Sequence, residues 1–472
     1  MISIKMGVLA NKYMSLFLIV LLGMGLRSYG LFERPLWYDE VFSIYVSDPL
    51  HSLSTVFNLT VKDVHPPLYQ VLLWLVHKVF GFGEHTGRVF SFVLGVAVIP
   101  SMYLLGRYFF NDYVGLLAAL LTSVNFIFVA KAQEARSYSL LVFLVIWSFL
   151  TLSNMIDKRS LGAVITYTAV ATMLVNTHYF GFLPVMTQFI LLLYFSTRSG
   201  FDKKLFVSSL VAGLIILSSV APIAYYIVQS LGRTGTWIPD LTADFVVEAF
   251  VIQFGDTCVA IVSVFFIMLG LGVLLRSEDK SDRLKILLLW YFLGFSVAYI
   301  RSVFFTTVLS FKNTIIFVPV LIVLVSYGFS LVRDSFSRWV LLIFFCVMSI
   351  TYFVSGPDYS KLQVVQDLRS PLIKISNENP GWPIYGGEIY SYYLRILDLP
   401  IQVEPYEVLE AKIVAHTVSP CFYVLDERWW PDHQKHLDIE LVERTSFENI
   451  SLSVFRTKGG ADCKLTRGAP LL

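Results

Sequence analysis

The chain has 472 residues, of which 56% are hydrophobic and only 15% are charged, and its mean hydropathy is +0.68. Soluble domains carry more charge and fewer apolar residues, so this composition indicates an integral membrane protein. Thirty-six basic residues nearly balance thirty-four acidic ones, and no basic tract marks a nucleic-acid partner. The composition therefore excludes a soluble enzyme and argues against a nucleic-acid-binding protein.

Apolar runs long enough to cross a bilayer recur through the first 355 residues. The first run, about Met14 to Leu26, lacks a small-residue cleavage site after it, so we expect a retained helix rather than a signal peptide. Further runs of the roughly 17 to 25 residues that a span needs lie at 88–106, 113–130, 137–156, 161–178, 180–196, 205–228, 256–275, 284–305, 313–332 and 338–355. Together these runs predict about eleven transmembrane helices.

One more apolar segment, His65 to Phe82, decides the orientation of every span that follows it. If this segment stays on the outer surface, basic residues gather in the cytoplasmic loops, as the positive-inside rule requires. These residues are Arg107, Lys158, Arg159, Arg198, Lys203, Lys204, Arg276, Lys280, Arg283, Lys285, Arg333 and Arg338. We therefore expect this segment to be an interfacial or re-entrant helix and the N-terminus to be cytoplasmic, in a multi-pass protein of the cell (plasma) membrane.

The C-terminal tail has a different pattern, in which short alternating runs between polar turns are typical of small half-buried strands. The runs lie at Phe422–Leu425, Ile439–Val442 and Leu452–Phe455. We expect an all-α membrane domain over 1–355, with its first outer loop at about 32–87 and interfacial helices in that loop. We expect a small extracytoplasmic α/β domain over 356–472.

Two outer features each have two interpretations. Cys421 and Cys463 could pair outside the cell, and two free thiols fit the sequence equally well. The loop at about 229–248 holds Gly and Pro residues that suit either a lid or a passive connector.

The loop after the first span holds two adjacent carboxylates, Asp39 and Glu40, just past a Trp-Tyr pair suited to the lipid headgroup layer. A carboxylate in this place can face both water and lipid. In the alternative interpretation, Asp39 only caps a surface helix and Glu40 is solvated.

Polar residues also gather in other segments at the outer membrane ends. Three segments carry most of them: Asp63–Tyr69, Lys131–Tyr138 and Asn176–Gly181. Three further basic residues lie near outer helix ends: Arg27, Arg301 and Lys312. Taken singly, each residue has a structural explanation, such as His65 capping a turn or His178 bonding to a neighbouring helix. Their convergence on one side favours a function, because ionisable groups at membrane depth are costly.

The stretches LWYDEVFS, DVHPPLYQVLLWLVHKVFG, AQEARSYSL and THYFG are similar to those of a known family. They resemble the polytopic GT-C glycosyltransferases (glycosyltransferase family 39-like) related to protein O-mannosyltransferases and to the aminoarabinose transferase of lipid A. The resemblance runs in order over about residues 14–196, with a weaker echo at 312–319. It implies a polyprenyl-phosphate-linked sugar donor, a protein, lipid or glycan acceptor met on the outer face, and inversion at the anomeric carbon.

Carried over by position, the resemblance implies that Asp39 is the general base, with Glu40 beside it as a second catalytic residue. The candidate residues for binding the donor phosphate or sugar are His65, Gln133, Glu134, Arg136, His178, Tyr179, Arg301 and Lys312. The chain departs from the family at Lys312, seven residues before Pro319, where the family often has an arginine. Lysine can still neutralise a phosphate, although it lacks the bidentate geometry of a guanidinium.

A divalent metal could bind at Asp39, Glu40 and His65, but no spacing demands one, so we assign no cofactor. The alternative function is a multispan transporter or flippase of a lipid-linked or polar substrate. Such proteins usually contain internal repeats and polar groups near mid-membrane. The second half of this chain repeats neither the Asp-Glu nor the Gln-Glu-Ala-Arg element, which favours glycosyl transfer.

Overall fold

The computed structural model describes residues 2–63, 65–231, 238–276, 281–355, 366–378, 381–426, 428, 430, 439–459 and 463. The chain forms two compact units. The first comprises Met1–Leu31, Ser52–Leu72 and Arg88–Asp358, and the second comprises Phe32–His51, Leu73–Gly87 and Tyr359–Leu472. The second unit thus includes two pieces of the first outer loop together with the C-terminal tail. Of the proposed lid loop, 232–237 lies outside the described residues.

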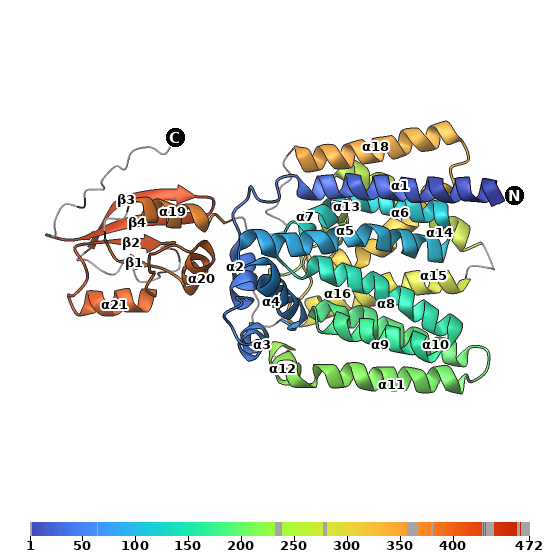
Figure 1. The fold of residues 1–472 in the computed structure, drawn as a ribbon, viewed down its shortest axis with the longest axis horizontal. Coiled ribbons are helices and arrows are strands. Elements are labelled where there is room, and N and C mark those ends of the chain that lie inside the picture. Colours follow the sequence, from blue (N-terminus) through green and yellow to red (C-terminus); the bar gives the residue numbers. More distant parts are fainter. Residues whose placement is uncertain are drawn as a thin grey trace. The chain divides into compact units, whose positions relative to one another are not determined.

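The part of the chain before the tail is helical, and the long helices of the first unit run side by side (Figure 1). The helices are α1 (Ile2–Ser28), α2 (Tyr38–Val46), α3 (Leu53–Lys62), α4 (Leu68–Phe80), α5 (Glu84–Phe109), α6 (Asp112–Val124), α7 (Phe126–Ala132), α8 (Tyr138–Lys158), α9 (Leu161–Val175), η1 (Tyr179–Gly181), α10 (Phe182–Thr197), α11 (Lys203–Val220), η2 (Ala221–Ile223), α12 (Ala224–Leu231), α13 (Phe245–Phe254), α14 (Thr257–Leu274), α15 (Ser281–Leu288), η4 (Leu289–Leu293), α16 (Gly294–Phe304), η5 (Asn313–Phe317), α17 (Val318–Ser330) and α18 (Ser335–Val354).

Among the described residues, eight helices are long and apolar enough to cross a bilayer, or nine if the bent pair α6 and α7 is one span. Each of the nine coincides with a run that the sequence predicts. The other two predicted spans fall on α1 and α9. With 15 residues, α9 rises only about 22 Å at about 1.5 Å per residue, which is short of the roughly 30 Å of bilayer hydrocarbon. Helix α4 has 13 residues and is also too short to cross alone, which fits an interfacial or re-entrant segment.

Burial separates the helix at the centre of the first unit from those at its surface. The span Asn313–Ser330, which ends in α17, is 94% buried, and α17 packs against α6 and α14. A side chain at Gly328 would collide with the backbone of Phe266, so this glycine permits the close approach of α17 to α14. By contrast, α11 and α18 expose many large apolar side chains, as expected of helices that face lipid.

The C-terminal tail forms a four-stranded sheet in the order β1-β2-β4-β3 (Figure 1). The strands are β1 (Ile384–Tyr385), β2 (Cys421–Leu425), β3 (Ile439–Phe447) and β4 (Ile450–Thr457), and the helices are α19 (Arg369–Glu378), α20 (Glu388–Leu397) and α21 (Tyr406–Val414). β1 pairs parallel with β2, and the other pairs are antiparallel. The three predicted runs fall in β2, β3 and β4, which confirms a small α/β element.

The core of this sheet explains how its two cysteines meet. Phe422 and Val424 on β2 pack with Phe455 on β4 in a buried cluster. Cys421 pairs across the sheet with Arg456 near the end of β4, and Cys463 follows Arg456 by seven residues in the sequence. Cys421 and Cys463 form a disulfide with their Cα atoms 5.8 Å apart.

Candidate functional site

The two adjacent carboxylates, Asp39 and Glu40, lie in the first turn of α2, in the second unit. The N-cap residue is Trp37, and Glu40 is buried while Asp39 is half-buried. The partial positive charge of a helix N-terminus favours carboxylates at these positions. Asp39 is therefore not the N-cap residue and Glu40 is not solvated, so this alternative interpretation of the pair is wrong in both details. Their catalytic roles stay predictions.

His65 joins two distant segments of the first unit. Its Nε2 accepts a hydrogen bond from the guanidinium of Arg136 at 3.1 Å, and its Nδ1 lies 3.2 Å from the carboxylate of Asp63. Because a guanidinium can only donate, Nδ1 of His65 carries the ring proton and donates it toward Asp63. The imidazole therefore hydrogen-bonds the Arg136 guanidinium and the backbone carbonyl of Asp63, the latter at 3.2 Å, and the Asp63 carboxylate lies at the same distance from Nδ1.

His178 lies between α9 and η1, beside the same arginine. Its ring centroid is 6.4 Å from that of His65 and 5.8 Å from that of Tyr138. Burial, followed by the nearby His65, Arg136 and Lys312, lowers the pKa of His178 well below its usual range. We refer to His65, Arg136, His178 and Lys312 as the histidine–arginine cluster.

The protonation state of His178 follows from its backbone contact. The backbone N–H of Phe180 donates to Nδ1 of His178 at 3.1 Å, so the proton of the neutral ring is on Nε2. The cluster therefore contains a neutral imidazole donor together with two cations, Arg136 and Lys312, both of which are buried. This combination suits an anion, because donors and positive charge are strongest where water is excluded.

A buried ion pair lies next to this cluster along the chain. Lys131 Nζ is 2.7 Å from Oε1 of Glu134, and the two side chains are only 1% and 6% exposed. The ammonium also lies 5.3 Å from the centroid of the Tyr138 ring. These contacts of Lys131 hold Glu134, and with it the Gln133–Arg136 element, in place in the first unit.

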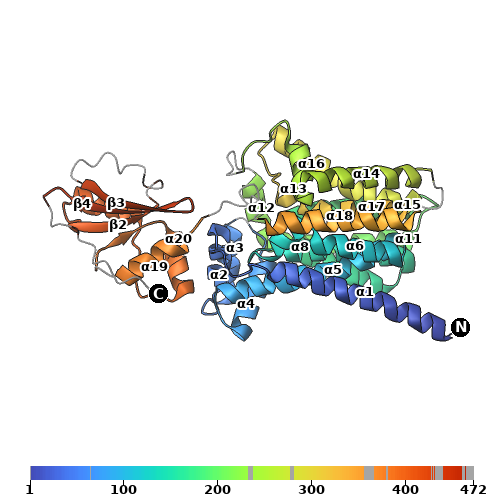
Figure 2. The ribbon, with the colours of Figure 1, turned by 90° about the horizontal axis from the view of Figure 1, so that it is seen from above.

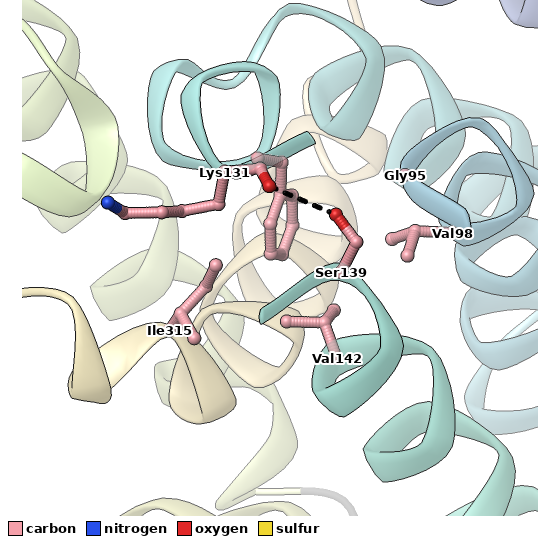
Figure 3. A pocket seen from close by; sticks show the side chains of 7 residues that line it. Gly95, Val98, Lys131, Ser139, Val142 and Ile315 are labelled. Carbon is pink, nitrogen blue, oxygen red and sulfur yellow. Dashed lines mark hydrogen bonds between the residues drawn. The ribbon is translucent and has the colours of Figure 1, made fainter. Parts of the chain in front are cut away.

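A small pocket borders Lys131, but it is too small for a sugar. Its lining residues are Gly95, Val98, Phe128, Lys131, Ser139, Val142 and Ile315. The cavity volume is about 10 Å³, which is room for about one water molecule. Figure 3 shows that the Lys131 side chain extends away from Ser139, whose hydroxyl donates to the Lys131 carbonyl at 3.2 Å. The pocket is therefore a packing gap behind the element.

Gln133 anchors the same element to the end of α1. Its amide donates to the carbonyls of Arg27 and Tyr29 at 3.1 and 2.6 Å. In return, the fully buried Arg27 donates to the carbonyls of Thr122 and Ser123 at 3.1 and 3.0 Å. These carbonyls lie at the end of α6, where the bend toward α7 removes their helical partners. The end of α1 therefore connects the Gln133–Arg136 element to the bend between α6 and α7.

The remaining predicted residues lie in two places. Tyr179 begins η1 directly after His178 and is half-buried. Arg301 lies in the last turn of α16, where it donates to the Thr306 carbonyl at 3.0 Å and lies over the Phe305 ring. Tyr179 is thus adjacent to the histidine–arginine cluster, whereas these contacts of Arg301 are at its own helix end.

Two buried residues of this region, Lys131 and Arg27, were not assigned to the site from the sequence. The i,i+3 spacing of Lys131 and Glu134 between two apolar runs was a usable signal, since a buried charge needs a partner and residues three apart on a helix are neighbours. The acceptors of Arg27 are backbone carbonyls about 95 residues away, and no sequence pattern marks such acceptors. Among the described residues, no group of three or more His, Cys, Asp or Glu side chains could hold a metal ion.

Residues 64–226 match the family model of the dolichyl-phosphate-mannose-protein mannosyltransferases. The matched range includes His65, the 133–136 element and His178, and it ends before Lys312. A comparison with curated protein sequences found no significant match.

The fold matches solved structures over nearly the whole chain. ArnT from Cupriavidus metallidurans in the apo state is 12% identical with a TM-score of 0.61, and the match covers 94% of this chain and 98% of ArnT. The oligosaccharyltransferase AglB from Archaeoglobus fulgidus is 12% identical with a TM-score of 0.57, and the match covers 89% of this chain and 70% of AglB. At 12% identity these matches show a shared fold, and the family-model match over 64–226 agrees with it. The GT-C fold, with its membrane helices and small C-terminal sheet, is the one that the sequence predicts.

The family match and the fold say what this chain is similar to. Together with the candidate membrane helices, they support an integral multi-pass membrane protein. Three members of the histidine–arginine cluster, His65, Arg136 and His178, lie in segments on which the resemblance depends, at 63–69, 131–138 and 176–181.

Proposed function

We propose that the chain transfers a sugar from a polyprenyl-phosphate-linked donor to an acceptor on the extracytoplasmic face of the membrane, with inversion at the anomeric carbon. Asp39 is the general base in this proposal, and Glu40 supports it. The observation that carries the proposal is the histidine–arginine cluster, in which buried cations and an imidazole donor gather in one part of the membrane unit.

The cluster suits the phosphate of the donor. Arg136 and Lys312 offset its negative charge, and His178 carries its ring proton on Nε2, which can donate to an anion. These interactions become stronger as the phosphate gains charge on leaving, so they lower the barrier rather than only binding the substrate. The polyprenyl phosphate departs as a stabilised anion and needs no general acid.

The acceptor side of the reaction needs a base. The acceptor O–H or N–H bond breaks and its proton goes to Asp39, while the acceptor atom forms the new bond to C1 of the sugar. The bond from C1 to the phosphate oxygen breaks, and its electron pair stays with the phosphate. One displacement of this kind inverts the anomeric carbon. The half-buried place of Asp39 in the first turn of α2 supports its assignment.

Two structural relatives support the donor class. One is ArnT from Cupriavidus metallidurans bound to undecaprenyl phosphate, and the other is AglB from Archaeoglobus fulgidus with a dolichol-phosphate and an inhibitory peptide. We extend the donor class, a polyprenyl phosphate, to this chain. The acceptor is a protein, a lipid or a glycan.

The test is transfer by the purified protein in detergent from a panel of radiolabelled polyprenyl-phosphate sugars, with membrane extract as the source of acceptors. Asp39→Asn is compared with Asp157→Asn, which changes an exposed aspartate at the end of α8. We expect transfer by the wild type and by Asp157→Asn, and a loss of about 10²- to 10⁴-fold in Asp39→Asn with donor binding unchanged.

Two outcomes would contradict parts of the proposal. A fully active Asp39→Asn enzyme would exclude this residue as the base while leaving the reaction class intact. No transfer from any donor by the wild type would contradict glycosyl transfer, and the protein would then be measured for transport of lipid-linked substrates into liposomes.

A further inference from the structure

Within the second unit, the C-terminal domain contacts the helix that carries Asp39. Helix α20 packs along α2, although about 350 residues separate their partners in sequence. The two helices lie side by side in Figures 1 and 2. The contacts of α20 fall on both sides of Asp39 along the chain.

Tyr393 makes the contact on the N-terminal side of Asp39. Its hydroxyl accepts the backbone N–H of Leu36 at 3.3 Å and donates to Glu84 at 2.6 Å. Burial, followed by the nearby Glu84, raises the pKa of Tyr393, so the hydroxyl stays protonated and keeps donating. Arg369 of α19 lies 3.7 Å from the same glutamate. The backbone just before α2 is therefore held by the C-terminal domain.

Arg395 and Tyr392 make the contacts on the C-terminal side. Arg395 contacts both carboxylate oxygens of Asp48, with its Nε at 2.8 Å and its Nη2 at 3.4 Å. Asp48 is almost fully buried, so this pairing is a geometric constraint as well as a charge interaction. The Tyr392 ring stacks on Tyr45 with centroids 3.8 Å apart and planes within 8° of parallel.

We propose that α20 is a positioning element for the general base, holding α2 by Tyr393 on one side of Asp39 and by Tyr392 and Arg395 on the other. We name these contacts the α2–α20 clamp. The inference rests on the proposed function, because it takes Asp39 to be the general base. It assigns the C-terminal domain a part in turnover and none in donor binding. A general base must lie within hydrogen-bond reach of its proton, so a small displacement of α2 reduces the rate strongly.

The test uses the double variant Tyr393→Phe/Arg395→Met in the full-length protein. The phenylalanine keeps the buried ring and removes only the hydroxyl, and the methionine keeps an apolar stem of similar length. The matched control is Lys412→Met, which removes an ion pair with Glu404 at 2.7 Å in the same domain and away from α2. Arg395→Lys is the conservative variant.

We expect the double variant to lower kcat by about 10- to 100-fold, with the Kd for the lipid-linked donor unchanged within about twofold. Arg395→Lys alone should retain most of the activity, and Lys412→Met should match the wild type. Wild-type kcat in the double variant would overturn the proposal. So would an equal loss in Lys412→Met, because it would indicate general loosening of the domain.

A second measurement separates failure of the clamp from failure of the proposed function. Amide hydrogen exchange of Tyr38–Val46 should become faster in the double variant and not in Lys412→Met. Unchanged exchange would overturn the clamp. Faster exchange in a protein whose wild type transfers no sugar would support the clamp as a contact and contradict the transferase proposal alone.

Discussion

The histidine–arginine cluster and the α2–α20 clamp both bury polar groups, but they are held in different ways. In the cluster, nitrogen donors and cations lie together, and His65 links Arg136 to Asp63. In the clamp, each cation or hydroxyl meets a carboxylate, as Arg395 meets Asp48. The comparison teaches that the cluster gathers donors and positive charge in one place, as a site for an anion would, whereas the clamp joins opposite charges across two segments and is suited to hold a backbone in place.

The largest expected effect is on the free energy of unfolding, and it comes from the buried Lys131–Glu134 pair beside the cluster in the sequence. Lys131→Met removes the cation that contacts Glu134, and leaving a carboxylate buried without its cation costs about 3 to 5 kcal/mol. The midpoint of thermal unfolding in detergent should fall well below that of the wild type. Adding Glu134→Gln should recover part of the loss, whereas Lys374→Met, which changes a half-buried pair in the second unit, should have little effect. An unchanged midpoint in Lys131→Met would contradict a structural role for the pair.

The next effect concerns the second unit alone. Replacing Cys421 and Cys463 by serine opens a loop of 42 residues, which the chain-entropy model values at about 4 kcal/mol. We expect faster trypsin cleavage of the C-terminal domain, with donor binding unaffected. Cys258→Ser, which changes an exposed free cysteine, serves as the control. Weaker donor binding in the double-serine variant would contradict our expectation that donor binding does not depend on this disulfide.

A smaller effect is expected on donor affinity. Arg136→Met should weaken binding of the lipid-linked donor by about 10- to 100-fold, since a hydrogen bond to a charged group is worth about 1.5 to 3 kcal/mol. Arg136→Lys should bind with intermediate affinity, because it keeps the charge without the planar fork. The control is Arg159→Met, which removes an exposed ion pair with Asp202 and should leave donor affinity unchanged. Equal affinity in Arg136→Met and the wild type would remove this arginine from the phosphate site.

The smallest effect is a dependence of stability on pH. Since burial lowers the pKa of His178 in the folded protein, the unfolded chain binds more protons below the usual histidine pKa of about 6.5. Stability therefore falls as the pH is lowered from 7.5 toward 5, and it is fully present above the unfolded pKa. His178→Asn should reduce this fall without removing it, because burial also lowers the pKa of His77. The unfolding midpoint measured across this pH range provides the test, and an identical slope in both proteins would contradict it.

Much of the membrane unit could be predicted from the sequence, because apolar runs of the right length mark spans regardless of which helices they contact. The convergence of His65, Arg136 and His178 could also be predicted, since the expected topology places the segment of each on the outer side of the membrane. The contact of Tyr393 with Glu84 could not, because it joins residues 309 apart and neither has a distinctive pattern. The cysteine pairing stayed open for a related reason: it depends on the register of β2 against β4.

The second unit also differs from the domain boundary that composition suggests. A change of composition near residue 355 marks the end of the apolar runs, but it says nothing about which earlier segments fold onto the tail. Residues 32–51 and 73–87 have such contacts, as the partners of Asp48 and Glu84 illustrate. Roles for Asp39, Glu40 and the residues that bind the donor stay predictions until variants are measured.

The buried Arg27 has a consequence for how the protein is made. Its guanidinium binds the carbonyls of Thr122 and Ser123, where α6 ends and the chain bends by 60° into α7. In hydrocarbon no water can bind such carbonyls, so the bend is stable there only with α1 beside it. Because α1 is synthesised before α6, Arg27 is inserted before its carbonyl acceptors have been made. A permuted gene that encodes α1 last should insert the bent segment poorly, as a glycosylation reporter placed after α7 would reveal.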